Sequence, residues 1–145
     1  MIEYSIARKE QLPGILALYK QLLPDEEPID INKANKIWEE GERQGIKYFI
    51  ATDGGRIVSS LYIALIPNLT RGGSPNGFIE NVITDENYRR KGIGKKLMKM
   101  AIEYGKKNNC YKVVLLSSVK RKEAQLFYED CGFNGGSKRG FEIRF

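Results

Sequence analysis

A chain of 145 residues, 41% of them hydrophobic and 29% charged, has the size and balance of a single soluble globular domain. Its apolar runs, such as residues 61–66, are far too short to cross a bilayer, and residues 1–5 lack the basic and apolar regions of a signal peptide. We therefore expect residues 1–145 to form one cytoplasmic domain with no membrane partner.

The net charge of +6 is unevenly distributed along the chain. Residues 85–122 contain twelve Lys and Arg against three acidic residues, a local charge of +9, whereas the rest of the chain sums to −3. Such a segment attracts a small polyanion as well as it attracts nucleic acid. Because neither a helix-turn-helix nor interleaved exposed aromatics can be recognised, we expect no nucleic-acid partner.

The chain contains two cysteines, Cys110 and Cys131, and no histidine. The two cysteines form no disulfide framework and lack the spacing of metal ligands. Without imidazole, Ser or Cys nucleophiles that depend on a histidine base are excluded, as are most zinc sites. We therefore expect no metal, and a catalytic base would be a carboxylate, a tyrosine or a water reached through one of them.

The N-terminal half predicts a strand, two helices and a hairpin, in that order. Residues 2–7 alternate as a strand does, and residues 10–23 place apolar side chains at helical spacing. After a break at residues 24–28, Asp30 can cap a second helix that runs to about Gln44. Residues 47–52 and 57–66 are predicted strands, joined by the turn sequence Asp53-Gly54-Gly55-Arg56.

The C-terminal half predicts three more strands and two helices. A strand at residues 78–84 follows a loop rich in Gly, Pro and Asn, and residues 92–107 form an amphipathic helix. A strand at 112–117, a helix at 122–131 and a closing strand at 140–145 complete the chain. The predicted order is β-α-α-β-β-β-α-β-α-β, an α/β domain in which about four helices flank a mixed central sheet.

The densest functional signal runs from Thr84 to Lys95, where a strand ends and two glycines open a helix loaded with cations. The free N–H groups and the macrodipole of a helix start favour a phosphate, and Gly92 and Gly94 would let the backbone close around a pyrophosphate. Taken alone, the two glycines are equally compatible with a tight strand–helix junction whose basic face is simply exposed to solvent. A P-loop is excluded because no Gly-Lys-Ser/Thr follows at the required distance, and a dinucleotide fingerprint is excluded because Leu97 occupies the place of its third glycine.

Two motifs in order make this segment more specific. Arg89-x-x-Gly92-x-Gly94 matches the Gln/Arg-x-x-Gly-x-Gly/Ala signature of the GNAT superfamily of N-acetyltransferases, in a strand–loop–helix setting. Residues 124–133 resemble its second signature, Ala-x-x-Phe-Tyr followed by Gly-Phe. The resemblance is close over residues 78–133, whereas the N-terminal half agrees only in its order of elements.

The resemblance implies acetyl-CoA as co-substrate. In that family the strand before the first signature holds the pantetheine arm through backbone groups, beside a splay in the sheet, which assigns Val82, Ile83 and Thr84. The pyrophosphate is held by backbone N–H groups, with Arg89 shaping the loop. The residues assigned to the pyrophosphate are Arg90, Lys91, Gly92, Ile93, Gly94 and Lys95.

One position departs from the family pattern. Arg121 stands where many members have an Asn that contacts the cofactor, within a run similar to that of aminoalkylphosphonate N-acetyltransferases. Arg121 can pair with a cofactor phosphate or with an anionic acceptor, and a solvated loop charge is the third alternative.

By resemblance, Tyr128 protonates the departing CoA thiolate, the alternative being an ordinary helix tyrosine with a wet hydroxyl. Glu80 is the predicted base, because strand alternation would place it on the same side as Val82 and Thr84. The glucosamine-phosphate branch of the family has a glutamate at the matching position, while a strand-edge carboxylate with a structural partner is the alternative. We expect direct transfer in a ternary complex, since no imidazole is present to activate a cysteine.

The predicted function is transfer of an acetyl group from acetyl-CoA to a primary amine of a small molecule. Amino-sugar phosphates, aminoalkylphosphonates, polyamines and amino acids all remain open as acceptors. Acetylation of a protein lysine or N-terminus is one alternative, and a non-catalytic sensor that binds acyl-CoA is another. Because many relatives are dimers, the resemblance also implies a homodimer.

Overall fold

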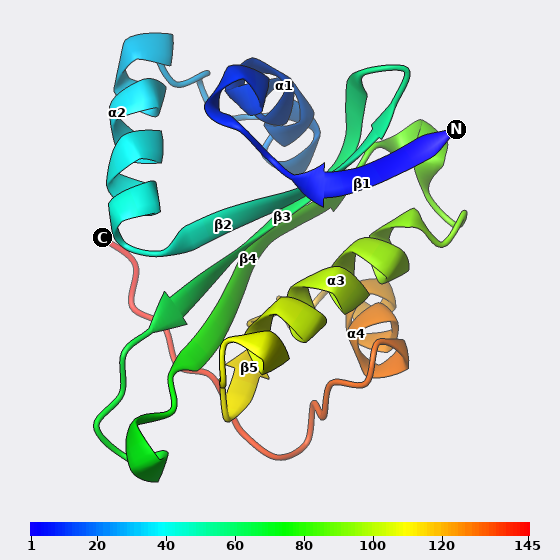
Figure 1. Ribbon diagram of the computed structural model, residues 1–145. Helices are drawn as coiled ribbons and strands as arrows, with labels where there is room; N and C mark the ends of the chain where they lie inside the picture. The colour runs from blue at the N-terminus through cyan, green and yellow to red at the C-terminus, as the bar shows by residue number, and fades with distance from the viewer.

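The computed structural model describes residues 1–145 and contains a five-stranded sheet with helices on both faces (Figure 1). The strands lie side by side in chain order; β1 to β4 pair antiparallel, and β5 joins β4 in parallel. This is the predicted mixed α/β architecture. The strands are β1 (Ile2–Ile6), β2 (Ile46–Asp53), β3 (Arg56–Ile66), β4 (Asn76–Thr84) and β5 (Lys112–Val114).

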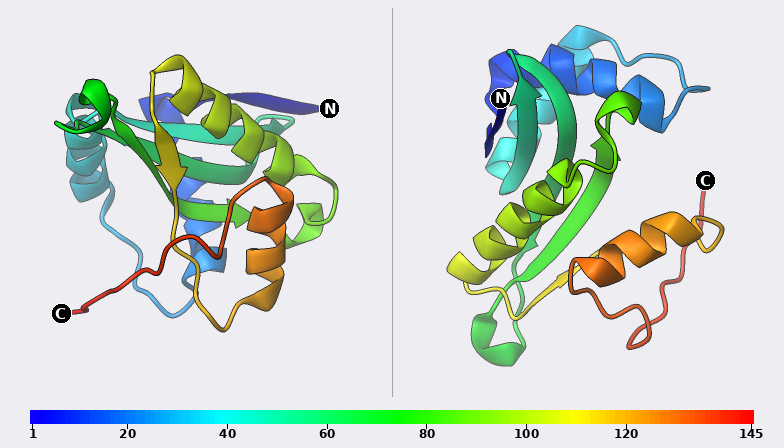
Figure 2. Two further views of the ribbon diagram at one scale, coloured as in Figure 1. Left: turned by 90° about the horizontal axis from the view of Figure 1, so that it is seen from below. Right: turned by 90° about the vertical axis from the view of Figure 1, so that its right-hand side faces the viewer.

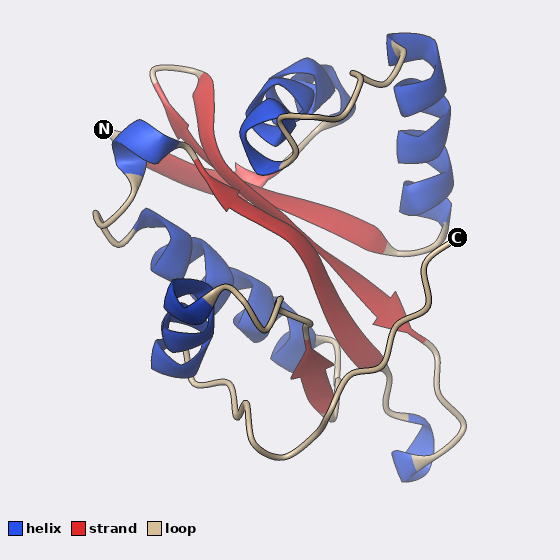
Figure 3. Ribbon diagram, turned by 180° about the vertical axis from the view of Figure 1, so that it is seen from behind, coloured by secondary structure: helices blue, strands red, loops and turns tan.

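The two faces of the sheet are covered by different helices. The helices are α1 (Leu12–Leu22), α2 (Ile31–Arg43), α3 (Ile93–Lys107) and α4 (Lys122–Asp130). Helices α1 and α2 lie on one face, and α3 and α4 lie on the other (Figures 1 and 3). The predicted cap of α2 is confirmed, because the Asp30 carboxylate accepts the backbone N–H groups of Asn32 and Lys33 at 3.0 and 3.1 Å. None of these helices has the length and apolar character that crossing a membrane would require.

Each face of the sheet buries its own apolar cluster. The cluster beneath α1 and α2 contains Ala7, Leu12, Ile15, Leu18, Ala34, Trp38, Ile50, Ile57 and Ile83. The cluster beneath α3 contains Phe49, Leu61, Ile63, Ile79, Leu97, Met98 and Ala101. Phe127 and Phe133 pack against the second cluster, so α4 is attached to the α3 face through aromatic side chains.

The predicted closing strand at residues 140–145 is wrong for this structure. The segment pairs with no strand, and the side chains of Phe141, Ile143 and Phe145 are 87%, 83% and 118% exposed. Its alternating sequence is that of a strand, but a strand forms only where a neighbour pairs with its backbone groups. The segment instead leads away from the sheet and ends clear of it (Figure 2).

An extra residue in β4 reverses the alternation of its side chains, so that corresponding positions before and after it point to opposite faces of the sheet. The partners of Glu80 and Ile83 on β3 are two positions apart, whereas Glu80 and Ile83 are three positions apart. Asn81 between them has a φ of 52°, as expected for a β-bulge. As a result, Ile79 belongs to the cluster beneath α3 and Ile83 to the cluster beneath α1 and α2, although a regular strand would place both on one face.

Strands β4 and β5 separate after a short common stretch. They pair only at Asn76 with Lys112, Gly77 with Val113, and Phe78 with Val114. Beyond these pairs the edge of β4 that faces β5 has no strand partner. This uncovered edge leads directly into the glycine-containing loop that the sequence predicts as a phosphate site.

Candidate active site

The loop from residue 85 to residue 92, called the cofactor loop below after the role predicted for it, joins the uncovered edge of β4 to α3. Its backbone is left-handed at Arg90, with φ of 61°, and at Gly92, with φ of 75°. Gly92 is the N-cap of α3 and supplies no side chain, so the first N–H groups of the helix are available to an anion. A Cβ on Gly92 would meet nothing within 4 Å, and the backbone conformation is therefore what favours glycine there.

Glycine at position 94 is favoured by packing inside the protein, whereas the sequence predicts a close approach to a pyrophosphate there. A Cβ on Gly94 would lie 3.1 Å from Thr84 Oγ1 and 3.5 Å from Phe127 Cζ. The absent side chain thus lets the first turn of α3 approach β4 and α4 closely. The structure accounts for Gly94 by packing within the protein, without reference to a ligand.

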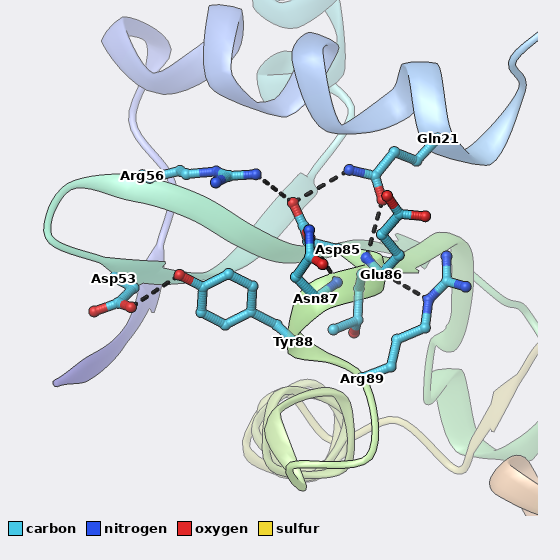
Figure 4. Close-up of polar contacts among 9 residues, drawn as sticks. Gln21, Asp53, Arg56, Asp85, Glu86, Asn87, Tyr88 and Arg89 are labelled. Atoms are coloured by element: carbon cyan, nitrogen blue, oxygen red, sulfur yellow. Dashed lines mark hydrogen bonds and ion pairs between the residues drawn. The ribbon is translucent and has the colours of Figure 1, made fainter.

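A buried carboxylate fixes the start of the cofactor loop (Figure 4). Asp85 is 1% exposed and accepts Arg56 Nη2 at 2.5 Å and Gln21 Nε2 at 3.2 Å. It also accepts the Asn87 backbone N–H at 2.9 Å, and the Gln21 amide oxygen accepts the Glu86 N–H at 3.0 Å. Burial alone would raise the pKa of Asp85, but the hydrogen bonds from Asn87, Gln21 and Arg56 outweigh it, so the pKa is lowered and the group stays ionised.

Two further hydrogen bonds hold the middle of the cofactor loop (Figure 4). The Tyr88 hydroxyl donates to Asp53 Oδ2 at 3.0 Å, which connects the loop to the β2–β3 hairpin. Arg89 Nε donates to the Thr84 carbonyl at 3.0 Å, which ties the loop to the last residue of β4. Arg89 thus contacts the backbone at the start of the loop.

The predicted pantetheine residues lie between the bulge and the cofactor loop. The Ile83 carbonyl accepts Ser59 Oγ at 3.1 Å, and the Thr84 carbonyl accepts the Arg89 side chain. The Val82 side chain packs against the cluster beneath α3. The backbone carbonyls of Ile83 and Thr84 therefore already accept a side-chain hydrogen bond, whereas the Val82 carbonyl accepts none from a side chain.

Tyr128 is half-buried on α4, with its ring centroid 5.4 Å from that of Phe127 and 6.2 Å from that of Phe133. Burial raises the pKa of Tyr128 above its ordinary value; the positive charge of Arg121 opposes this rise, and the negative charge of Glu80 adds to it. The phenol therefore keeps its proton at neutral pH, the form that an acid requires. The charges of Arg121 and Glu80 thus both act on the Tyr128 hydroxyl.

The face predicted for Glu80 is wrong. The bulge at Asn81 turns Glu80 toward α1 and α2, whereas Val82 and Thr84 point toward α3. Glu80 pairs with Tyr62, whose pKa is raised first by burial and then by the negative charge of Glu80. The Glu80 carboxylate and the side chains of Val82 and Thr84 thus lie on opposite faces of β4.

Neither cysteine has an activated thiol. Burial raises the pKa of Cys110 and, in the same way, that of Cys131, where the charge of Lys95 opposes the rise without cancelling it. Both groups remain protonated at neutral pH and are poor nucleophiles. Lys95 itself bonds Asp130 at 2.7 Å and connects α3 to α4.

The comparison with known families agrees with this arrangement. The family model described as "Acetyltransferase (GNAT) family" matches residues 12–133, which is most of the chain. The chain belongs to the GNAT family. This confirms the family expected from the two motifs and extends it over the N-terminal half, where the sequence showed only the order of elements.

The relatives of this GNAT chain include two glucosamine 6-phosphate N-acetyltransferases. That of Trypanosoma brucei brucei is 40% identical over 99 residues, which are 67% of this chain and 65% of the relative. That of Arabidopsis thaliana is 34% identical over 83 residues, which are 57% of this chain and 54% of the relative. The chain therefore spans only about half to two thirds of the length of these curated relatives.

A solved structure shows the same fold over nearly the whole length. A putative acetyltransferase from Agrobacterium tumefaciens str. C58 superimposes with a TM-score of 0.93 at 38% identity, covering 99% of both chains. The order and packing of elements described above are thus those of this GNAT neighbour.

Sequence reasoning missed the side chains that fix the cofactor loop of this GNAT chain. Gln21 carries no motif, Asp53 and Arg56 were recognised only as the ends of a hairpin turn, and all three lie far from the loop in sequence. Only Asp85 and Tyr88 stood within the segment that attracted notice. Their partners became visible only when α1 and the β2–β3 hairpin were placed beside the loop.

Proposed function

We propose that this protein transfers the acetyl group of acetyl-CoA to a primary amine of a small molecule. The observation that carries the proposal is that, in this GNAT chain, the uncovered edge of β4 leads into a loop with left-handed backbone positions. That loop ends at the start of α3, which has no side-chain cap. A strand edge suits the amide groups of pantetheine, and a helix start suits a pyrophosphate. Glucosamine 6-phosphate is the acceptor we propose first, because the two relatives described above are named glucosamine 6-phosphate N-acetyltransferases.

In this proposal the cofactor lies along β4 and the cofactor loop. Val82, Ile83 and Thr84 hold pantetheine through backbone groups, and residues 90–95 hold the pyrophosphate through their N–H groups. Arg121, at the N-cap of α4 and close to Tyr128, supplies positive charge at the same end of the site. The local charge of +9 over residues 85–122 favours the approach of such a polyanion.

The proposed reaction is direct transfer between two bound substrates. The amine nitrogen attacks the thioester carbonyl, so that a C–N bond forms and the C–S bond breaks. The Val82 N–H polarises the carbonyl, Glu80 takes the proton from the amine, and Tyr128 gives its proton to the departing thiolate. The bulge at Asn81 supports this division, because it places the Glu80 carboxylate on one face of β4 and the side chains of Val82 and Thr84 on the other.

We also propose that the protein works as a homodimer. Residues 140–145 carry exposed apolar side chains at alternate positions and no backbone partner. A second copy of the chain would cover these side chains and pair with the segment, which a single chain leaves in solvent.

The test is release of CoA thiol from acetyl-CoA in the presence of single amines. The panel contains glucosamine 6-phosphate, glucosamine, an aminoalkylphosphonate, spermidine, an amino acid and a peptide with a free N-terminus. Each is assayed with the wild type, with Tyr128→Phe and with the control Tyr111→Phe, which removes a hydroxyl from a partly exposed residue just before β5.

Release with glucosamine 6-phosphate that depends on Tyr128, but not on Tyr111, is the expected result. Release with the peptide alone would make the protein an acetyltransferase of polypeptides. Binding of acetyl-CoA without release for any amine would favour a sensor. A chain that fails to bind acetyl-CoA would contradict the proposed cofactor site.

A further inference from the structure

The last turn of α1 contacts β4 and the cofactor loop at two places that belong to different halves of the proposed site. Gln21, the residue before the helix ends, bonds the Asp85 carboxylate at 3.2 Å and the Glu86 N–H at 3.0 Å, which are the first two residues of the cofactor loop (Figure 4). Tyr19, two residues earlier, lies beside the bulge. Its hydroxyl has no hydrogen-bond partner, and its pKa is raised by burial while the nearby Asn81 side chain opposes the rise.

The same turn leads directly into residues 23–30, the exposed segment between α1 and α2. The segment is acidic at Asp25, Glu26 and Glu27, and every one of its residues is exposed. Helix α1 therefore connects three parts of the molecule: the cofactor loop, the bulge next to Glu80, and an exposed acidic segment. The hydrogen bonds of Gln21 and the continuous backbone of α1 therefore offer a physical route by which ordering of the loop can reach residues 23–30.

We propose that Gln21 is a positioning residue that couples the cofactor loop to residues 23–30. The inference rests on the proposed function, because it takes the cofactor loop as the place where coenzyme A binds. The Gln21 amide donates to one loop residue and accepts from the next, so it follows any movement of the loop. Coenzyme A that orders the loop then orders the end of α1 and the segment after it, and by linkage any ligand that orders residues 23–30 favours binding of coenzyme A.

The location of Gln21 separates this coupling role from a structural one. Asp85 keeps its bonds to Arg56 and Asn87 when Gln21 is changed. Gln21, Arg56 and Asp85 also line a pocket of about 320 Å³, through which water can reach the freed groups. Water can satisfy the carboxylate and the N–H separately. It cannot join them to α1, so the fold survives while the connection is lost.

Hydrogen exchange measured by mass spectrometry, with coenzyme A as the probe, tests the proposal. Gln21→Met keeps the length of the side chain and removes both hydrogen bonds. Lys20→Met is the matched control, because Lys20 is the exposed neighbour of Gln21 on α1 and its side chain does not contact the cofactor loop through a hydrogen bond. All three proteins are compared with and without saturating coenzyme A.

In the wild type and in Lys20→Met, coenzyme A is expected to slow exchange in both the cofactor loop and residues 23–30, the latter by about fivefold, the low end of measured couplings. In Gln21→Met the loop is still protected at saturation, residues 23–30 are not, and the Kd for coenzyme A rises by about fivefold.

Equal protection of residues 23–30 in the wild type and Gln21→Met would overturn the proposal. Protection of the loop without protection of residues 23–30 in the wild type would overturn it as well. A wild-type loop that coenzyme A leaves unprotected would contradict the proposed cofactor site itself, and the coupling with it.

Discussion

Replacement of Asp85 by Asn measures how strongly a buried carboxylate holds the cofactor loop. An asparagine keeps the shape of the side chain and an oxygen for the Asn87 N–H, but it presents an NH₂ group to the donors of Arg56 and Gln21. Hydrogen bonds to a charged group contribute about 1.5–3 kcal/mol each. Because Arg56 is 62% exposed and recovers water, we expect about half of the sum for the two bonds, so that the free energy of unfolding falls by about 1.5–3 kcal/mol.

The lowered pKa of Asp85 gives this difference a pH dependence of known sign. The folded chain binds a proton at Asp85 less readily than the unfolded chain, where the ordinary pKa is 3.8. The stability that the carboxylate contributes is therefore fully present above that value and is lost as the pH falls through the lower, folded-state pKa. The gap between the wild type and Asp85→Asn should be widest near neutral pH and should narrow below about pH 4.

Urea unfolding followed by circular dichroism at several values between pH 7 and pH 3 measures the gap. Glu86→Gln is the control. It removes the carboxylate of the next residue in the chain, which is exposed and makes no side-chain hydrogen bond. Equal free energies of unfolding for Asp85→Asn and Glu86→Gln at pH 7 would show that the Asp85 carboxylate does not hold the cofactor loop. A gap that stays constant below pH 4 would show that the carboxylate does not act through its charge.

Three further predictions concern the reaction, the glycines and the oligomer. Tyr128→Phe should lower kcat by about 10²–10⁴-fold in steady-state assays and leave the calorimetric Kd for acetyl-CoA nearly unchanged; an unchanged kcat would remove Tyr128 from the chemistry. In thermal unfolding, Gly94→Ala should lower the free energy of unfolding by about 1–3 kcal/mol, because the added methyl group overpacks against Thr84 and Phe127. Gly92→Ala should lower it by about 1–2 kcal/mol, because alanine disfavours the left-handed backbone there. An unchanged free energy for either variant would show that its position does not require glycine. Removal of residues 140–145 should convert a dimer to a monomer in light scattering, and a truncated chain that remains dimeric would place the interface elsewhere.

Local patterns were sufficient to predict most of the fold. The cap at Asp30, the glycines of the β2–β3 turn and the apolar spacing of α3 act over a few residues, so their physical effect can be recognised without a tertiary structure. The cofactor loop belongs to the same class, because the left-handed backbone at Gly92 favours glycine at that one position. The motif around it was therefore visible, together with the family to which it belongs.

Three features depended on pairing between distant parts of the chain. The face of Glu80 is set by a bulge at Asn81, which exists only because β4 pairs with β3 in a shifted register. The Gln21–Asp85 contact joins residues 64 positions apart and needs α1 beside the cofactor loop. Residues 140–145 have the alternation of a strand, yet no neighbour in this chain pairs with them. Side-chain periodicity specifies which conformation a segment can adopt, whereas its partner and the face it presents follow from contacts that form only in the folded chain.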